Sequence, residues 1–293
     1  MPASLAAPSL PSPDSPLDWL AIDPDALDLA PILSAYRQDG FALIPGVASQ
    51  AALAALTERA HAIMTGAVDH RPFFFQHDAA TGRYEDAPLG EGWVGPSPAY
   101  RKIEKLERDP VFLRWTENAL FARLARTLVG PDIALYRAIL MTKPARTERG
   151  PGGTLLPWHQ DAGALWGLDR SPRVQLWTAL DDAPRDAGCM VFAKGTHLEG
   201  LASALGGIVP PAVHGLHPAA LDPVVVPAKA GDVVLLDNLV WHASALNTTP
   251  HPRRAFSVCF MDPATRCTRK RGAPRTFPRV FAPVSASSAA HTR

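Results

Sequence analysis

The chain has 293 residues, a formal net charge of +1 and an apolar fraction of 47%. This length and composition suffice for one β domain with a sizeable core, or for two small domains. The near-neutral charge gives no global field that recruits nucleic acid or a membrane surface, and the longest apolar runs are far shorter than the ~20 residues that span a bilayer. We therefore expect neither nucleic-acid nor membrane partners.

The N-terminal part of the chain predicts a tail followed by helices. Residues 1–18, rich in Pro, Ala, Ser and Leu, predict a flexible tail that buries too little surface to order itself. Apolar residues at helical spacing predict helices over 25–39, 50–65 and 109–129, with Ser49 and Asp109 as N-caps of the last two. Residues 41–44 predict a short strand, and residues 67–98 predict an irregular loop near a pocket mouth.

After Gly130 short apolar runs recur between turn signals. They predict strands over 133–141, 174–180, 190–192, 224–226, 233–236 and 255–260, while 201–220 predicts a long loop. Many short strands with this spacing indicate a sandwich, a jelly roll or a barrel. We expect one domain over residues 19–285, with a second flexible tail at 286–293.

The three cysteines, Cys189, Cys259 and Cys267, are widely spaced. They fit neither a disulfide framework nor a zinc-binding pattern. Reduced thiols of this kind are typical of a cytoplasmic protein, and we expect that localisation.

The residues that carry chemistry are His159, Asp161 and His242. Two histidines and one carboxylate form the facial triad that holds non-heme Fe(II) and leaves other coordination positions open. Side chains two apart in a strand share a face, so His159 and Asp161 can reach one metal at a strand end. The alternating segment 233–241 predicts a strand that brings His242 to the same metal from across the sheet.

Arg253, downstream of His242, offers a cation for a dicarboxylate cosubstrate. Taken singly, a histidine or a His-x-Asp pattern recurs by chance, and the hypothesis depends on the whole set. That set predicts an oxygenase that depends on Fe(II) and 2-oxoglutarate. A zinc hydrolase and a non-catalytic metal-binding β-barrel sensor are the alternatives.

Several stretches together resemble the phytanoyl-CoA dioxygenase family of Fe(II)/2-oxoglutarate oxygenases. The similar stretches are residues 39–46, Trp158-His-Gln-Asp161, residues 174–182 and 188–192, Gly195-Thr-His197, residues 231–234, His242-Ala-Ser244 continuing to Asn247, and Arg253-Arg-Ala255. The resemblance covers about residues 30–262. It implies a mainly β fold, with a double-stranded β-helix (jelly-roll, cupin-like) core and flanking N-terminal α-helices.

The resemblance also implies roles for single residues. His159, Asp161 and His242 would be the Fe(II) ligands, and Asp161 fills the place that halogenating relatives leave open, which favours oxygenation. Arg253 and Ser244 would hold the far carboxylate of 2-oxoglutarate. Trp177 would line the cosubstrate pocket, with core packing as its alternative role, and Lys102 would lie near the cosubstrate or else pair with a nearby Glu.

The expected reaction is hydroxylation of an unactivated C–H bond of a small molecule, with O2 as cosubstrate and release of succinate and CO2. An acyl thioester or a biosynthetic intermediate fits the apolar wall that Trp166 and Phe74 predict beside the metal. Desaturation, epoxidation or cyclisation of a natural-product intermediate would use the same cofactors.

Overall fold

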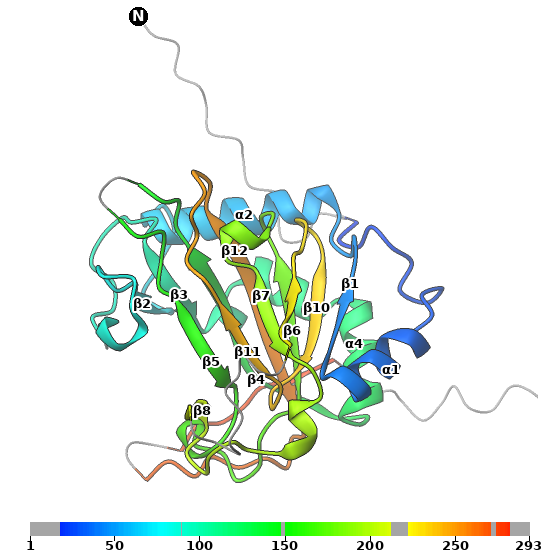
Figure 1. The fold of residues 1–293 in the computed structure, drawn as a ribbon. Coiled ribbons are helices and arrows are strands. Elements are labelled where there is room, and N and C mark those ends of the chain that lie inside the picture. Colours follow the sequence, from blue (N-terminus) through cyan, green and yellow to red (C-terminus); the bar gives the residue numbers. More distant parts are fainter. Residues whose placement is uncertain (1–17, 89, 148–149, 212–221, 271–273, 282–293) are drawn as a thin grey trace, which may run out of the picture.

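The computed structural model describes residues 18–88, 90–147, 150–211, 222–270 and 274–281. Within these ranges two antiparallel β-sheets pack face to face, and helices cover the outer face of the larger sheet (Figure 1). The predicted tails at 1–18 and 286–293 lie outside the described residues, apart from Asp18.

The strands after β3 pass back and forth between the two sheets. The larger sheet has the order β1 (Phe41–Ile44), β10 (Val233–Asp237), β6 (Val174–Ala179), β12 (Arg253–Met261), β4 (Ile133–Lys143), β3 (Tyr100–Glu104), β2 (Phe74–His77), and β13 (Arg279–Val280) pairs with β4. The smaller sheet has the order β8 (Gly207–Ile208), β5 (Leu156–Gln160), β11 (Trp241–Ser244), β7 (Met190–Ala193), β9 (Val224–Val226). This alternation confirms the predicted jelly roll, because a double-stranded β-helix winds between two facing sheets.

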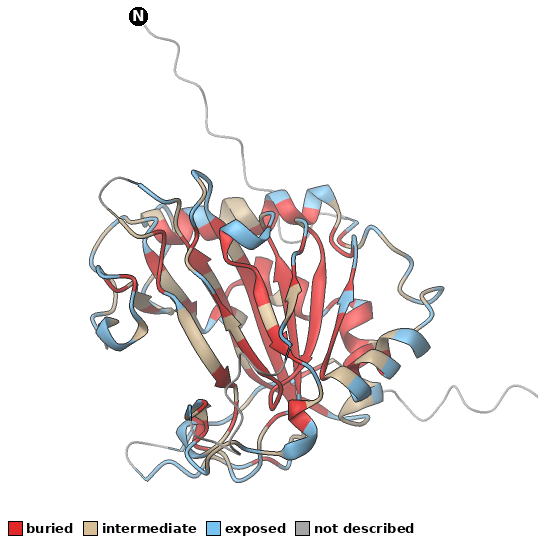
Figure 2. Ribbon diagram, in the orientation of Figure 1, coloured by how far each residue is buried: buried red, intermediate tan, exposed pale blue. Residues whose placement is uncertain are grey.

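The helices lie on the face of the larger sheet that points away from the smaller one. They are α1 (Ala30–Asp39), α2 (Gln50–Thr65), α3 (Pro110–Thr116) and α4 (Ala119–Leu128), with short 3₁₀ turns η1 (Tyr84–Asp86), η2 (Leu106–Arg108), η3 (Ala164–Trp166), η4 (Arg185–Ala187) and η5 (Thr196–Glu199). Leu56, Phe112 and Leu124 from these helices share one buried cluster with Leu176 and Val258 of the sheet. Figure 2 shows buried residues along the strands that these helices cover.

A second apolar cluster fills the space between the two sheets. Phe41 of β1 stacks on Phe192 of β7, with ring centroids 4.2 Å apart, and Trp177 and Met190 belong to the same cluster. Trp177 and Met190 also line a polar cavity between the two sheets. Among the described residues no helix has the length and apolar composition needed to cross a bilayer.

Two predicted helices have different bounds in the structure. The helix expected over 25–39 begins at Ala30, because Asp23 and Asp28 accept backbone N–H bonds in turns before it. The helix expected over 109–129 is two helices. Asn118 ends the first and caps the second by accepting the backbone N–H of Phe121, at 2.9 Å.

Two predictions for the sheet were also wrong. The segment 233–241 is not one strand, since a turn at 238–240 separates β10 in the larger sheet from the start of β11 in the smaller sheet. The loops expected over 67–98 and 201–220 contain the strands β2 and β8, and residues 212–220 of the second loop lie outside the described residues. Both strands are edge strands whose pairing partners are distant in sequence, so the local pattern does not show them.

The buried packing of α3 against the larger sheet leads to a prediction about stability. Phe112 is 0% exposed and its ring lies 4.8 Å from that of Phe256. Phe112→Ala is expected to lower the free energy of unfolding by about 3–5 kcal/mol, because it leaves a cavity in a rigid core. Leu198→Ala, at a side chain that is 71% exposed, should change it by less than about 0.5 kcal/mol. Denaturant unfolding measures both, and equal effects would contradict the packing described here.

Candidate metal centre and cosubstrate cavity

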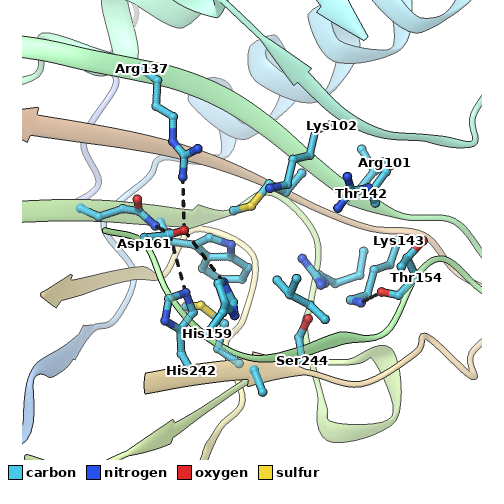
Figure 3. A pocket seen from close by; sticks show the side chains of 17 residues that line it. Arg101, Lys102, Arg137, Thr142, Lys143, Thr154, His159, Asp161, His242 and Ser244 are labelled. Atoms are coloured by element: carbon cyan, nitrogen blue, oxygen red, sulfur yellow. Dashed lines mark hydrogen bonds and ion pairs between the residues drawn. The ribbon is translucent and has the colours of Figure 1, made fainter. Parts of the chain in front are cut away.

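His159, Asp161 and His242 meet where β5 lies beside β11. The two histidines are directly paired in the antiparallel register, and their ring centroids are 4.0 Å apart. One potential ligand atom from each of the three residues lies within 4.8 Å of the others. Figure 3 shows both imidazoles and the carboxylate pointing toward one another at one end of a cavity. The structure thus brings together the three residues that the sequence predicted as metal ligands.

Both imidazoles are held so that Nε2 carries a free lone pair. The Nδ1 atom of His159 lies 2.9 Å from the carbonyl oxygen of Pro157, and that of His242 lies 3.0 Å from the carbonyl oxygen of Val240. A carbonyl oxygen only accepts, so Nδ1 must donate in each ring, and the neutral ring then leaves Nε2 unprotonated. Burial lowers the pKa of His159 to about 3, which keeps this ring neutral at physiological pH.

The Asp161 carboxylate stays charged although it is buried. Burial alone raises its pKa, but the positive charge of Arg137 and the nearby imidazoles together hold that pKa below its usual range. Gln175 donates from Nε2 to Oδ2 at 2.9 Å, and Arg137 Nη2 lies 3.4 Å from Oδ1. The Nε2 atoms of His159 and His242 lie 3.9 and 3.8 Å from the two carboxylate oxygens. Two imidazole nitrogens and one anionic oxygen are a donor set that suits Fe(II).

The same cavity holds the residues predicted for the cosubstrate. The cavity is lined by Arg253, Ser244, Trp177 and Lys102, together with Arg101, Arg137, Met141, Lys143, Thr154, Gln175 and Met190. Arg253 is 4% exposed, its Nη2 donates to the carbonyl oxygen of Gly188 at 3.2 Å, and its Nε has no partner among the described residues. The guanidinium lies 5.8 Å from the ring centroid of Trp177. Trp177 lines the cavity and also belongs to the apolar cluster between the sheets.

Lys102 points into the cavity from β3 (Figure 3). Within the described residues its ammonium makes neither a hydrogen bond nor an ion pair, and Glu104 instead accepts from Gln76 at 2.7 Å. The alternative of a Lys102–Glu pair is therefore not what the structure shows. Burial, and then the charges of Arg137 and Arg101, lower the pKa of Lys102 to about 8.

The two predicted substrate residues do not line this cavity. Trp166 stacks on Tyr136, with ring centroids 4.7 Å apart, and lies under the guanidinium of Arg137. Phe74 is 38% exposed on the edge strand β2. A role of either residue in binding substrate stays a prediction.

The sequence reasoning missed Arg137, Gln175 and Lys143. Each lies on a strand that is otherwise mostly apolar, and a charged or amide side chain in such a strand is the signal that could have found them. Arg254, next to Arg253, lies on the opposite side of β12 and pairs with Asp181 at 2.7 Å. Arg253 lines the cavity and Arg254 does not, and a role of Arg253 in binding the cosubstrate stays a prediction.

Comparisons with known proteins agree with this fold. A family model described as phytanoyl-CoA dioxygenase (PhyH) matches residues 36–255. The phytanoyl-CoA dioxygenase domain-containing protein 1 of Mus musculus is 28% identical over 184 residues, which are 60% of this chain and 62% of that protein. The first curated relatives are matched over 54–62% of their own length, which is less than two thirds.

The solved structures that share the fold include those of SnoN and ThoJ. The epimerase SnoN in complex with Fe3+, alpha ketoglutarate and nogalamycin RO has a TM-score of 0.65 and 21% identity, covering 88% of this chain and 99% of SnoN. The non-heme monooxygenase ThoJ, in its apo form, has a TM-score of 0.60 and 25% identity, covering 87% of this chain and 85% of ThoJ.

If His159, Asp161 and His242 bind a metal, the loss of one of these side chains should abolish metal binding. Asp161→Ala and His242→Ala are expected to lose Co(II) binding at pH 7, and Gln175→Leu should weaken it by about 10–100-fold, because Gln175 orients the carboxylate. His251→Ala, which removes an exposed histidine, is the matched control. Calorimetric titration gives the affinities. Unchanged affinity in Asp161→Ala would show that this carboxylate is not a ligand.

Proposed function

The chain belongs to the phytanoyl-CoA dioxygenase family, and from this premise we propose that it is a non-heme iron oxygenase that uses 2-oxoglutarate and O2. Its reaction is the hydroxylation of an unactivated C–H bond of a small molecule. The observation that supports this function is one cavity with a His–Asp–His donor set at one end and a buried arginine at the other.

The overall reaction is R–H + O2 + 2-oxoglutarate → R–OH + succinate + CO2. One oxygen atom replaces the C–H bond by C–O–H, and the other enters succinate as the bond between C1 and C2 of 2-oxoglutarate breaks. Bound iron would supply the activation of O2, which no side chain can provide. His159, Asp161 and His242 would hold that iron and leave coordination positions open toward the cavity.

The remaining lining residues bind and orient the cosubstrate. Arg253 would pair with the far carboxylate of 2-oxoglutarate, since a planar guanidinium matches carboxylate geometry. Its unpartnered buried Nε is a donor that such a carboxylate would satisfy. Ser244 would donate to the same group, Trp177 would form the wall, and Lys102 would offer a second positive charge.

The substrate is proposed to be a small molecule, such as a biosynthetic intermediate or an acyl thioester. Desaturation, epoxidation or cyclisation would use the same residues and differ in where the substrate lies. A non-catalytic sensor would bind the cofactors without turnover. The three free cysteines suit the reducing conditions of the cytoplasm, which is the proposed localisation.

The central test is an anaerobic titration with Fe(II) and 2-oxoglutarate, in which the chelate gives a weak visible charge-transfer band. Arg253→Gln is expected to raise the Kd for 2-oxoglutarate by about 10–100-fold, because a charged hydrogen-bonded pair contributes about 1.5–3 kcal/mol. Arg254→Gln, on the other side of the strand, is the matched control and should leave the Kd unchanged. If Arg253→Gln left the Kd for 2-oxoglutarate unchanged, Arg253 would not be the residue that holds the far carboxylate.

Turnover separates an enzyme from a sensor. Under air the loaded protein should convert 2-oxoglutarate to succinate slowly without substrate, and the His242→Ala variant should not. Iron and 2-oxoglutarate bound with no succinate formed would favour the sensor.

The lowered pKa of Lys102 predicts that cosubstrate binding depends on pH. Its pKa of about 8 means that the ammonium is charged below that pH and loses its proton above it. The dianionic 2-oxoglutarate prefers the charged form, so its affinity should be constant below about pH 8. Above that it should fall by up to about tenfold per pH unit. Lys102→Arg should abolish the fall, and an unaltered profile in that variant would remove Lys102 from the site.

A further inference from the structure

Arg137 is a cation of the cavity that the proposed cosubstrate clamp does not use. It lies on β4 in register with Cys259 of β12, which is itself in register with Gln175 of β6. Arg253 and Lys143 form the pair six residues further along the same two strands. At ~3.4 Å per residue the two pairs are separated by roughly 20 Å along the backbone. Arg137 therefore serves the metal end of the cavity (Figure 3).

Most of the donors of Arg137 are unused. A guanidinium has five N–H donors, and among the described residues its one polar contact is Nη2 to Asp161 Oδ1 at 3.4 Å. That distance exceeds the ~2.7–2.9 Å of a charge-assisted hydrogen bond. The Nε atom is buried without a partner. Asp161 already accepts a 2.9 Å bond from Gln175, so the carboxylate does not by itself account for this arginine.

An aromatic wall fixes the position of the guanidinium. Its centre lies 4.2 Å from the ring centroid of Trp166, which stacks on Tyr136 at an interplanar angle of 14°. The hydroxyl of Tyr136 donates to the carbonyl oxygen of Trp166 at 3.0 Å, which holds the two rings together. An arginine that stacks by its face keeps its N–H edge for a planar anion.

The charges of the cavity leave room for another anion. Among the described lining residues Asp161 is the one carboxylate, against five basic side chains, Arg101, Lys102, Arg137, Lys143 and Arg253. Iron(II), Asp161, the 2-oxoglutarate dianion, Lys102 and Arg253 already sum to a positive charge. Arg137 adds to that excess, and a buried charge without a partner is costly.

We propose that Arg137 binds a carboxylate of the substrate, so that the substrate is a small organic acid that is oxidised near its carboxylate end. This inference rests on the proposed function, because the metal beside Arg137 defines where oxidation occurs. The anion lies between the stacked guanidinium and the open side of the metal site, at the opposite end from the cosubstrate clamp.

The test uses the full chain loaded anaerobically with Fe(II) and 2-oxoglutarate. Benzoate, hexanoate and cyclohexanecarboxylate are the probes, each compared with its own primary amide. Binding is measured by the shift of the visible chelate band and by the rise in Tm. At least one acid is expected to bind at least tenfold more tightly than its amide. Arg137→Gln and Arg137→Met should lose this preference and keep the chelate band.

Arg275→Gln is the matched control. Arg275 is an exposed arginine over the ring of Tyr136, at 4.8 Å, and it does not line the cavity. This variant should keep the preference for acids.

Three results would overturn the proposal: no acid preference in the unaltered protein, an acid preference that survives in the Arg137 variants, or loss of the chelate band in those variants. The last result would mean that Arg137 serves only to stabilise the Asp161 carboxylate. The comparison of acid with amide uses the unaltered protein. It therefore tests the preference for a carboxylate even if the variants fail to fold. Failure of the unaltered protein to form the chelate is seen before any probe is added, and it counts against the proposed function instead.

Discussion

The pairing of β5 with β11 places His159 opposite His242, and the chemistry of the cavity depends on that register. A slip by one residue would turn one imidazole to the other face of the sheet. Gln160, between His159 and Asp161, anchors this end of β5 from the side that faces away from the metal site. Its side chain donates to the carbonyl oxygens of Gly200 and Leu239 and accepts from the backbone of Ala202. A polar residue facing away from the metal thus holds the two ligands that face toward it.

The same local arrangement prepares both histidines. In each strand Nδ1 bonds to the carbonyl oxygen two residues earlier, which sets the tautomer without help from another side chain. Burial keeps His159 neutral, while neighbouring positive charge keeps Asp161 ionised. Desolvation therefore favours the neutral form at His159, which a metal ligand needs, but it disfavours the charged form that Asp161 needs and must be offset there. Arg137 is part of that offset, and its unused donors leave it able to bind a second anion.

The sequence predicted the three metal ligands and Arg253 because each lies in a short motif whose order along the chain is specific. It also predicted the β-rich core, since the strands after Gly130 have clear apolar runs between turns. It did not predict Arg137 or Gln175, because their meeting with Asp161 depends on the pairing of β4, β12 and β6, which no local pattern encodes. The break at 238–240 was missed for a similar reason. That segment alternates as one strand would, and the turn is stabilised by tertiary bonds such as Asn238 Nδ2 to the carbonyl oxygen of Asp161.

The fold itself separates the two binding tasks of the cavity. Strands β4 and β12 run antiparallel, and three of their polar side chains line the cavity: Arg137 and Lys143 on β4, and Arg253 on β12. The loop that follows β5 meets this sheet beside Arg137, since Asp161 is the residue after that strand. A dicarboxylate held by Arg253 would reach from that end of the cavity toward the metal. The space left for a substrate is then the metal end. There the N–H edge of Arg137 faces the cavity, and the aromatic stack of Trp166 and Tyr136 supports the guanidinium from behind without lining the cavity.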